Sequence, residues 1–260
     1  MEHTFAVTAY GDSPYLESCL KSLIGQSVQS NIIICTSTPG DYIRMMAEKY
    51  DIQLFVREGE HGIGYDWNFA YEHADSRLVT IAHQDDIYHH DYVRTLMETK
   101  EKYPDMSVFM TSSVSIKNGK LAEYGSIELI KKLLRTPLRI RELNHIPSVK
   151  RAVISWGNPV ICPSCSYDKK LCGENIFDTK YRFVLDWDAL YRLASGPGRW
   201  ICVERPLIMY RVHKDAATGQ AIRDKTREQE EAEMFNRMHS ESVSELIMGF
   251  YKKSYDAYKE

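Results

Sequence analysis

The chain has 260 residues, 43% of them hydrophobic and 27% charged, and a formal net charge of −3. This composition is ordinary for a globular protein and excludes collagen-like, low-complexity and disordered classes. The slightly acidic balance argues against a general nucleic-acid binder, which is usually basic.

The first half of the chain predicts alternating strands and helices. Apolar runs predict strands at 5–9, 32–35, 52–56 and 78–82. Helical patterns lie between them, two of which open on Ser-Pro or Thr-Pro pairs that are typical of helix starts. Such alternation predicts a parallel sheet with right-handed crossovers.

The second half is more mixed. Further strands are predicted at 108–111, 160–162, 201–203 and 206–212, with a hairpin turn at Asn118-Gly119. Residues 127–151 are predicted to be helical with breaks at Pro137 and Pro147, and another helix runs from about Asp186 to Ser195. The expected fold class is α/β, with a mostly parallel central sheet flanked by helices and a C-terminal helical extension.

Two adjacent carboxylates, Asp85 and Asp86, follow the strand at 78–82. Open parallel sheets bind ligands at the carboxyl ends of their strands. Adjacent carboxylates repel each other in a cleft, and a divalent cation with a diphosphate would relieve that repulsion. The alternative is a solvated turn or an acidic helix start. Gly59, Gly62 and Gly64 match neither a dinucleotide fingerprint nor a P-loop.

Cysteines and termini suggest a protein without disulfides. Residues 1–4 do not read as a signal peptide, and no run of about 18 apolar residues predicts a membrane span, so we expect a cytoplasmic protein. Cys162 and Cys165 have CxxC spacing with Cys172 nearby, but no fourth zinc ligand stands at a suitable distance. Buried apolar cysteines are the favoured interpretation.

Several segments in fixed order resemble family 2 glycosyltransferases of the GT-A fold, over about residues 4–218. They are residues 7–10, 13–23, 26–27, 62–70, 83–88, 183–188 and 210–213. The resemblance implies a glycosyltransferase domain at 1–218, with a nucleotide-binding half at 1–112 and an acceptor and catalytic half at 113–218. Residues 219–260 would form a C-terminal helical extension.

The resemblance also implies site residues. Asp186 would be the catalytic base, although its other interpretation is a helix N-cap, and Trp187 and Asp188 would contact the acceptor. Asp85, Asp86 and His213 would bind a divalent metal, Mn or Mg. The donor nucleotide would be bound by nine residues: Ala9, Tyr10, Gly11, Thr36, Asp66, Asn68, His83, Asp86 and Arg211.

Four positions depart from the family pattern. His83 replaces the first Asp of the DxD motif, and Leu185 replaces the Glu of the Glu-Asp motif. Trp67 stands in place of the usual Arg before Asn68. Thr36-Ser37-Thr38 stands where the family carries its base-reading Asp, which makes Asp66 the substitute candidate.

The expected function is therefore an inverting glycosyltransferase. It would move a sugar from a nucleotide-sugar donor, with a UDP-sugar as the first expectation, to a hydroxyl of a glycan or lipid-linked glycan. One alternative is a non-catalytic nucleotide- or glycan-binding homologue, which the departures at His83 and Leu185 keep open. Another is a sugar nucleotidyltransferase, but no Gly-rich Lys/Arg signature follows the first strand. No nucleic-acid partner is expected.

Two charged segments suggest surfaces. Residues 131–151 hold seven Lys or Arg and one Glu, which could bind anionic lipid headgroups at the inner face of the membrane or a pyrophosphate-linked acceptor, or form a solvated helix face. In residues 219–260, four glutamates (Glu228, Glu230, Glu231 and Glu233) would repel a diphosphate. Apolar residues at helical spacing there (Val243, Leu246, Ile247 and Phe250) predict packing on the domain or on a second subunit.

Overall fold

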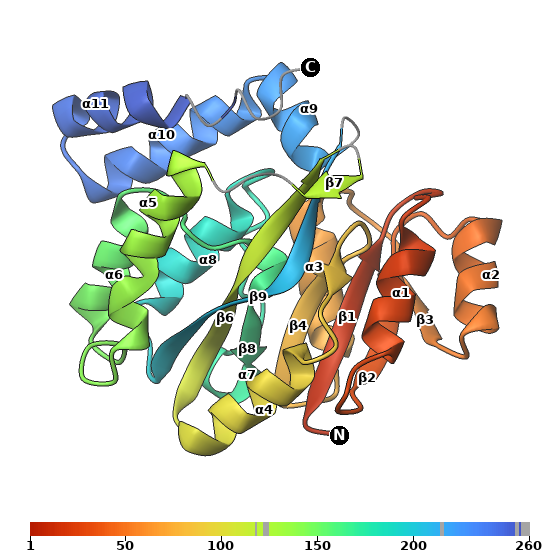
Figure 1. The fold of residues 1–260 in the computed structure, drawn as a ribbon. Coiled ribbons are helices and arrows are strands. Elements are labelled where there is room, and N and C mark those ends of the chain that lie inside the picture. Colours follow the sequence, from red (N-terminus) through yellow and green to blue (C-terminus); the bar gives the residue numbers. More distant parts are fainter. Residues whose placement is uncertain (118, 122–124, 214–215, 253–254, 256–260) are drawn as a thin grey trace.

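A nine-stranded mixed sheet forms the centre of the computed structural model, which describes residues 1–117, 119–121, 125–213, 216–252 and 255 (Figure 1). The strand order is β3-β2-β1-β4-β8-β6-β9-β5, and β7 pairs with β6. The strands are β1 (His3–Ala9), β2 (Asn31–Thr36), β3 (Gln53–Val56), β4 (Leu78–His83), β5 (Ile87–Tyr88), β6 (Met106–Lys117), β7 (Lys120–Leu121), β8 (Ser166–Asp168) and β9 (Arg199–Val212).

Helices cover both faces of this sheet. They are α1 (Leu16–Ile24), α2 (Asp41–Lys49), α3 (Ile63–His73), α4 (Tyr92–Lys102), α5 (Ser126–Arg135), α6 (Pro147–Ser155), α7 (Lys169–Cys172), α8 (Leu185–Leu193), α9 (Ala217–Arg223), α10 (Thr226–Met238) and α11 (Glu241–Tyr251). Two short 3₁₀ helices, η1 (Thr136–Arg139) and η2 (Cys162–Ser164), complete the described elements.

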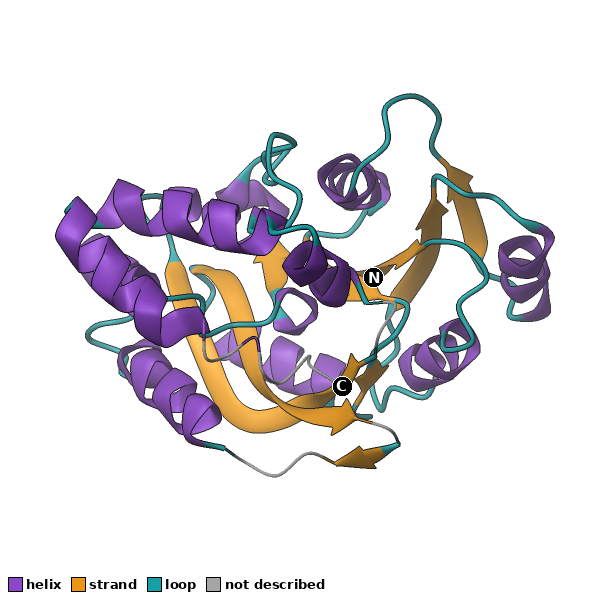
Figure 2. Ribbon diagram, turned by 90° about the horizontal axis from the view of Figure 1, so that it is seen from above, coloured by secondary structure: helices purple, strands orange, loops and turns teal. Residues whose placement is uncertain are grey.

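The side-chain alternation of the strands divides the core in two. On β1, Phe5 and Val7 belong to the buried cluster of α1, α2 and α4, whereas Ala6 between them belongs to the cluster that includes α3, α6, α8 and α10. Successive side chains of a strand point to opposite faces, so a strand with helices on both sides buries both sets of side chains. Figure 2 shows helices on both sides of the twisted sheet.

The predicted parallel half of the fold is confirmed. Strand β1 pairs in parallel with both β2 and β4, and β2 pairs in parallel with β3. The predicted hairpin is also present, because β6 and β7 are antiparallel, although residue 118 lies outside the described residues. Cys162 and Cys165 are free thiols, 5% and 1% exposed, as the apolar interpretation requires.

One strand prediction in the second half is wrong, and two others merge into one strand. Residues 160–162 form no strand; η2 begins at Cys162, and Pro163 has no N–H with which to join a ladder. The two strands predicted at 201–203 and 206–212 are the single strand β9, which is interrupted by register shifts opposite Thr111–Ser113. Pro206 lies within this irregular stretch, where a missing donor is tolerated.

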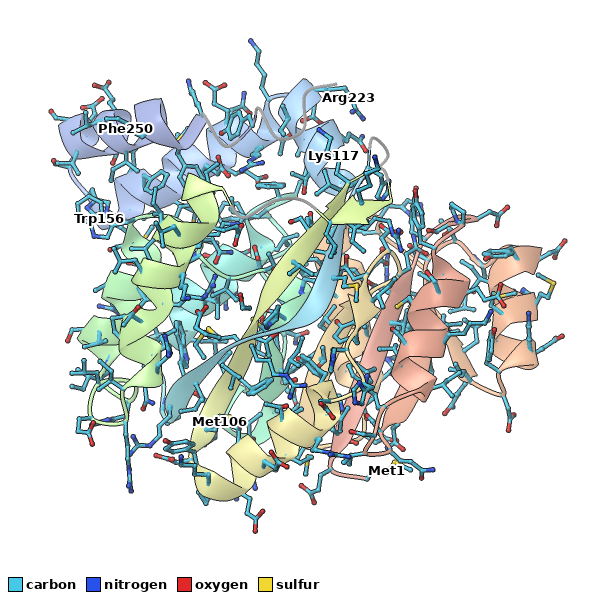
Figure 3. The ribbon with its side chains drawn as sticks, in the orientation of Figure 1. Met1, Met106, Lys117, Trp156, Arg223 and Phe250 are labelled. Carbon is cyan, nitrogen blue, oxygen red and sulfur yellow. The ribbon has the colours of Figure 1, made fainter. Side chains whose placement is uncertain are left out.

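The chain reverses its winding direction between β1 and β4. From β1 it moves outward to β2 and β3, and it then returns to β4 on the other side of β1. Ligands bind at such a switch point, beyond the carboxyl ends of the strands. Figure 3 shows Lys117 and Arg223 at this upper end of the molecule, and Met1 and Met106 at the opposite end.

The C-terminal helices share the core of the sheet domain. Met234, Phe235 and Met248 belong to the same buried cluster as Trp187 and Ile154. The expected packing on the domain is therefore present in the described part of residues 219–260, but it is made by other side chains than the ones expected, because Leu246 and Phe250 are 64% and 65% exposed. The division of the chain at residues 112 and 218 stays a prediction.

Candidate active site

The loops after β1 and β4 meet at the switch point. Thr8 on β1 lies opposite His83 on β4. Beyond this pair, the backbone N–H of Tyr10 donates to Oε1 of Gln84 (3.1 Å), and Nε2 of Gln84 donates to the carbonyl of Tyr10 (2.9 Å). Gly11 has φ +58°, which an L side chain rarely adopts. These contacts fix the loop and leave the Tyr10 side chain 66% exposed.

Asp85 is held from three sides. Its Oδ1 accepts a hydrogen bond from the Ser13 hydroxyl (2.9 Å), and its Oδ2 lies 3.3 Å from Nε2 of His213. Nε of Arg211 donates to the backbone carbonyl of Asp85 (2.9 Å). The loop before α1 and the end of β9 therefore position the Asp85 carboxylate, which stays partly exposed to solvent.

Asp86 is almost fully enclosed. It is 1% exposed, its Oδ1 accepts from the backbone N–H of Arg211 (3.0 Å), and its buried Oδ2 has no hydrogen-bond partner. Burial, and to a smaller degree the charge of Asp85, raises the pKa of Asp86 to about 8. Asp86 therefore holds the end of β9 through its Oδ1. Its Oδ2 is a buried oxygen without a partner, which a cation would stabilise.

Two of these side chains, Asp85 and His213, lie at the spacing of neighbouring metal ligands. Nε2 of His213 and Oδ2 of Asp86 are both buried without hydrogen-bond partners. A six-coordinate cation at about 2.1 Å places neighbouring ligand atoms about 3 Å apart, close to the 3.3 Å between Asp85 and His213. Carboxylate oxygen and imidazole nitrogen both suit Mn²⁺.

The end of β9 lies against an aromatic side chain. The Arg211 guanidinium is 4.3 Å from the ring centroid of Tyr15, and the His213 ring lies 5.0 Å from the same ring. The cation–π contact holds Arg211 without neutralising it. A positive side chain is thus kept next to the Asp85–His213 pair, where it can meet a phosphate.

His83 is an uncharged side chain in this cleft. It stacks on Trp67 at 5.1 Å between centroids, and burial lowers its pKa to about 4. Its Nε2 has no hydrogen-bond partner. A neutral imidazole cannot replace the charge of a DxD aspartate, but it can still donate or accept one hydrogen bond.

The side of the cleft formed by β2 and β3 carries a polar network. Thr38 Oγ1 accepts from the N–H of Gly11 (2.8 Å), and the Thr36 hydroxyl accepts from the N–H of Thr38 (3.0 Å). Asp66 accepts from Nε of Arg57 (2.8 Å) and from the hydroxyl of Ser37 (3.1 Å). Asp66 is therefore paired with Arg57, and its contact with the base stays a prediction.

Asn68 has a different partner from the one expected. Its Nδ2 donates to the carbonyl of Phe177 (2.8 Å), and its Oδ1 accepts from the N–H of Phe177 (3.1 Å). Both halves of the amide are used in joining α3 to a loop. Asn68 therefore joins α3 to this loop, and it also lines a surface pocket with Arg57, Tyr65 and Phe177. Its contact with the nucleotide stays a prediction.

Asp186 lies in the first turn of α8. Its Oδ2 accepts from Nδ2 of Asn158 (2.9 Å), and its Oδ1 accepts from the N–H of Trp187 (2.8 Å). Burial raises the pKa of Asp186 to about 6, although both hydrogen bonds act in the opposite direction. Burial, and to a smaller degree the charges of Asp186 and Asp86, raises the pKa of the Cys162 thiol.

The two expected acceptor residues are structural. Trp187 is 2% exposed, and its Nε1 donates to the carbonyl of Ile154 (2.9 Å). Asp188 is 1% exposed and accepts from Nε of Arg192 (2.8 Å) and from Arg237 (2.6 Å). Neither side chain reaches solvent, so the geometry does not support their interpretation as acceptor contacts.

Several positioning residues carry no signal in the sequence. Ser13, Gln84, Arg57 and Asn158 are polar residues in loops, and only the tertiary contacts distinguish them from other loop residues. Glu230 of α10 accepts hydrogen bonds from the N–H groups of Arg182 (2.9 Å), Phe183 (2.8 Å) and Val184 (3.1 Å). An acidic side chain on these N–H groups favours the start of α8.

A second set of potential metal ligands lies apart from these residues. Ligand atoms of His89, His90 and Asp91 come within 4.8 Å of one another. Asp91, however, is already paired with Arg205 at 2.6 Å, which lowers its pKa. This set follows β5 and does not include Asp85 or Asp86.

In the part of the chain that the structure describes, no helix is long and apolar enough to cross a membrane.

Comparison with known proteins finds one matching family and several similar structures. The model of a family described as Glycosyl transferase family 2 matches residues 4–170. No curated protein matches the sequence. Similar solved structures include the TarS fragment 1–349 of S. aureus in complex with UDP-GlcNAc, with a TM-score of 0.63, 15% identity, and coverage of 100% of this chain and 74% of that one.

Two further structures were solved with Mn²⁺. The mannosyltransferase PcManGT of Pyrobaculum calidifontis, in complex with GDP-Man and Mn²⁺, has a TM-score of 0.64 and 16% identity, covering 100% of this chain and 76% of that one. Glucosyl-3-phosphoglycerate synthase of Mycobacterium tuberculosis, in complex with Mn²⁺ and UDP-Glc, has a TM-score of 0.55 and 12% identity, with coverages of 91% and 78%. At such identities the likeness shows a shared fold.

Proposed function

The chain belongs to glycosyl transferase family 2 and has a GT-A-like fold, and we propose that it is an inverting, metal-dependent enzyme. As a member of this family it takes its sugar from a nucleotide-sugar donor. The finer proposal is that a UDP-sugar is the donor and that a hydroxyl of a glycan or lipid-linked glycan is the acceptor. The observation that carries it is the pair of carboxylate centres, Asp85 with His213 and Asp186 with Asn158.

The donor would lie across the switch point between β1 and β4. The loop of Ala9, Tyr10 and Gly11 would contact the nucleoside, and the exposed Tyr10 ring can stack on its base. Arg211, held by Tyr15, would bind the diphosphate. Two of the three similar structures described above were solved with UDP-sugars and one with GDP-Man, which supports UDP as the first nucleotide to test.

A divalent cation would be held by Asp85 and His213, with Asp86 supporting the site through its contact with β9. When bound, it would neutralise charge on the diphosphate leaving group. Mn²⁺ is the first ion to test, because two similar structures contain it. Asp86 has a second task that needs no metal, because its Oδ1 accepts from the N–H of Arg211 and so fixes the strand end that carries His213.

Asp186 would take the proton of the acceptor. In the transfer, the acceptor oxygen forms a bond to the anomeric carbon while the bond from that carbon to the diphosphate oxygen breaks. The acceptor's proton passes to an oxygen of Asp186, and the nucleoside diphosphate leaves with the bonding electron pair. A pKa near 6 leaves this carboxylate mostly ionised at neutral pH yet more basic than an ordinary aspartate. Asn158 would orient it.

Calorimetry and a transfer assay test the proposal separately. UDP, GDP and dTDP are titrated with Mn²⁺ and with chelator, and we expect UDP to bind most tightly and only with the metal. Release of UDP from UDP-sugars is then measured with and without candidate glycan acceptors. Metal-dependent UDP binding without any sugar transfer or donor hydrolysis would favour the non-catalytic alternative. Equal affinity for UDP with Mn²⁺ and with chelator would contradict the proposed metal site.

A further inference from the structure

Helix α5 has its apolar face turned away from the protein. Leu129, Ile130 and Leu133 lie on one face of the helix at i, i+1 and i+4, and they are 69%, 57% and 71% exposed. An amphipathic helix of a globular protein normally buries this face against the core. Here the face contacts solvent, so a contiguous apolar surface remains unpartnered in the chain that the structure describes. Figures 1 and 2 show α5 on the outside of the molecule.

The polar face of α5 is the one that is anchored. Arg135 is 4% exposed and donates through Nε and NH2 to the carboxylate of Glu204 on β9 (2.9 and 3.3 Å). It also donates to the carbonyl of Pro159 (2.6 Å). Turning the apolar face inward would break this buried bidentate pair and leave two unpaired charges. The outward orientation is therefore fixed by the structure.

Exposed Lys and Arg residues accompany the apolar face along the chain. Residues 131–141 contain five Lys or Arg and no Asp or Glu, in a chain whose net charge is −3. Arg135 is paired with Glu204 and Lys131 lies 3.2 Å from Glu128. Lys132, Arg139 and Arg141 are exposed. An exposed apolar stripe bordered by Lys and Arg is typical of helices that lie in the interface of a membrane with anionic lipids.

We propose that α5 and the following segment to Arg141 dock on an anionic lipid surface. Leu129, Ile130 and Leu133 would enter the boundary between headgroups and acyl chains, while Lys132, Arg139 and Arg141 would contact lipid phosphates. A second copy of the chain is a poorer occupant, because a twofold interface would bring two equally basic surfaces together. The docking is independent of the proposed sugar transfer, although the anchor at Pro159 lies next to Asn158, which holds Asp186.

Vesicle co-sedimentation tests this surface without donor, acceptor or metal. The protein is mixed with vesicles of phosphatidylcholine alone or of phosphatidylcholine with phosphatidylglycerol. We expect binding only to the second kind, and weaker binding at higher salt, because the ionic contacts are screened. Combining Leu129→Gln with Leu133→Gln should lower vesicle binding by roughly tenfold or more, since two inserted side chains are lost. Combining Lys132→Glu with Arg139→Glu should also lower it.

The matched control is a double substitution of exposed apolar residues elsewhere. Ile24 on α1 and Met45 on α2 are each 50% exposed, and Ile24→Gln with Met45→Gln should leave vesicle binding unchanged. Thermal melts and UDP binding of every variant should match the parent, because the changed side chains lie on the surface. Equal binding to both kinds of vesicle, or full binding by the Leu129/Leu133 variant, would overturn the proposal. The proposal would also be overturned if light scattering shows that the parent protein is a dimer, that the Leu129/Leu133 variant is not, and that neither protein binds vesicles.

Discussion

Nε2 of His213 lies 3.3 Å from Oδ2 of Asp85, which joins the end of β9 to the end of β4. The two residues are far apart in the sequence, and the strand pairing of the sheet brings them together. Their proximity creates a mixed oxygen and nitrogen ligand set beside a positive side chain, Arg211. This relationship supports the metal-dependent binding of a diphosphate.

Removing one of these ligands should weaken nucleotide binding that depends on the metal. Asp85→Ala should lower UDP affinity in Mn²⁺ by at least about tenfold, and more than Asp86→Ala, because Asp86 has its main contact with the backbone of Arg211. Isothermal calorimetry with Mn²⁺ and with chelator measures both. His213→Ala should act in the same direction. His90→Ala serves as the control, because His90 belongs to the other set of potential ligands. A larger loss of UDP affinity in His90→Ala than in Asp85→Ala would place the metal at His90 instead.

Substitution of the proposed base should affect turnover and leave binding intact. Asp186→Asn keeps the hydrogen-bonding size but cannot accept the acceptor's proton. Transfer should fall by roughly 10²–10⁴-fold, or about 3–5 kcal/mol of transition-state stabilisation. Steady-state rates with a single donor and acceptor measure this, with UDP affinity as the check on folding. Near-normal turnover by folded Asp186→Asn would contradict the assignment.

Asp188 offers a matched comparison on the same helix. It pairs with Arg192 and Arg237 and so joins α8 to α10. Asp188→Asn should therefore lower the free energy of unfolding by roughly 1.5–3 kcal/mol, through weakened bonds to charged groups. The loss in turnover should be much smaller than for Asp186→Asn. Chemical denaturation and the same transfer assay separate the two effects, and the reverse pattern would make Asp188 the base.

The pKa of Asp186 predicts the acid limb of the pH profile. Burial raises this pKa to about 6, so the base is protonated and inactive below that pH and ionised above it. Log kcat/KM should rise with pH and level off above about pH 6. Asn158→Ala removes a donor that favours the carboxylate, so the limb should move to higher pH. Asn31→Ala, which removes an amide bonded to Ser76 at the amino ends of β2 and β4, should leave the profile unchanged.

Gly157 links the C-terminal helices to the same carboxylate. It has φ +126°, and a Cβ there would overlap the ring of Tyr251. The hydroxyl of Tyr251 accepts from the N–H of Asn158 (3.2 Å). Gly157→Ala should therefore cost roughly 1–3 kcal/mol of stability and reduce turnover by displacing Asn158. Tyr251→Phe loses a single hydrogen bond, worth about 1 kcal/mol, so its losses of stability and turnover should be smaller. Thermal melts and transfer rates measure both variants, and a larger loss in Tyr251→Phe than in Gly157→Ala would contradict this.

The parallel half of the fold follows from local patterns in the sequence. The apolar runs at 5–9, 32–35, 52–56 and 78–82 are short and separated by helical patterns and turn residues, which predicts strands, although β3 at the sheet edge is only partly buried. Their order placed Asp85 and Asp86 at a strand end. The family pattern pointed to Asp186 and His213, because local motifs keep their order along the chain.

Which polar side chains stay available for function depends on contacts between distant parts of the chain. Trp187 and Asp188 are next to Asp186 in sequence, yet packing against α6 and α10 buries both of them. Asn68 and Asp66 are occupied by Phe177 and Arg57, which no local pattern indicates. The direction of α5 was equally hidden: its periodicity shows an apolar face, but the buried Arg135–Glu204 pair decides that this face points outward. Periodicity follows from the local chain, whereas burial and charge pairing depend on what the fold brings against each side chain.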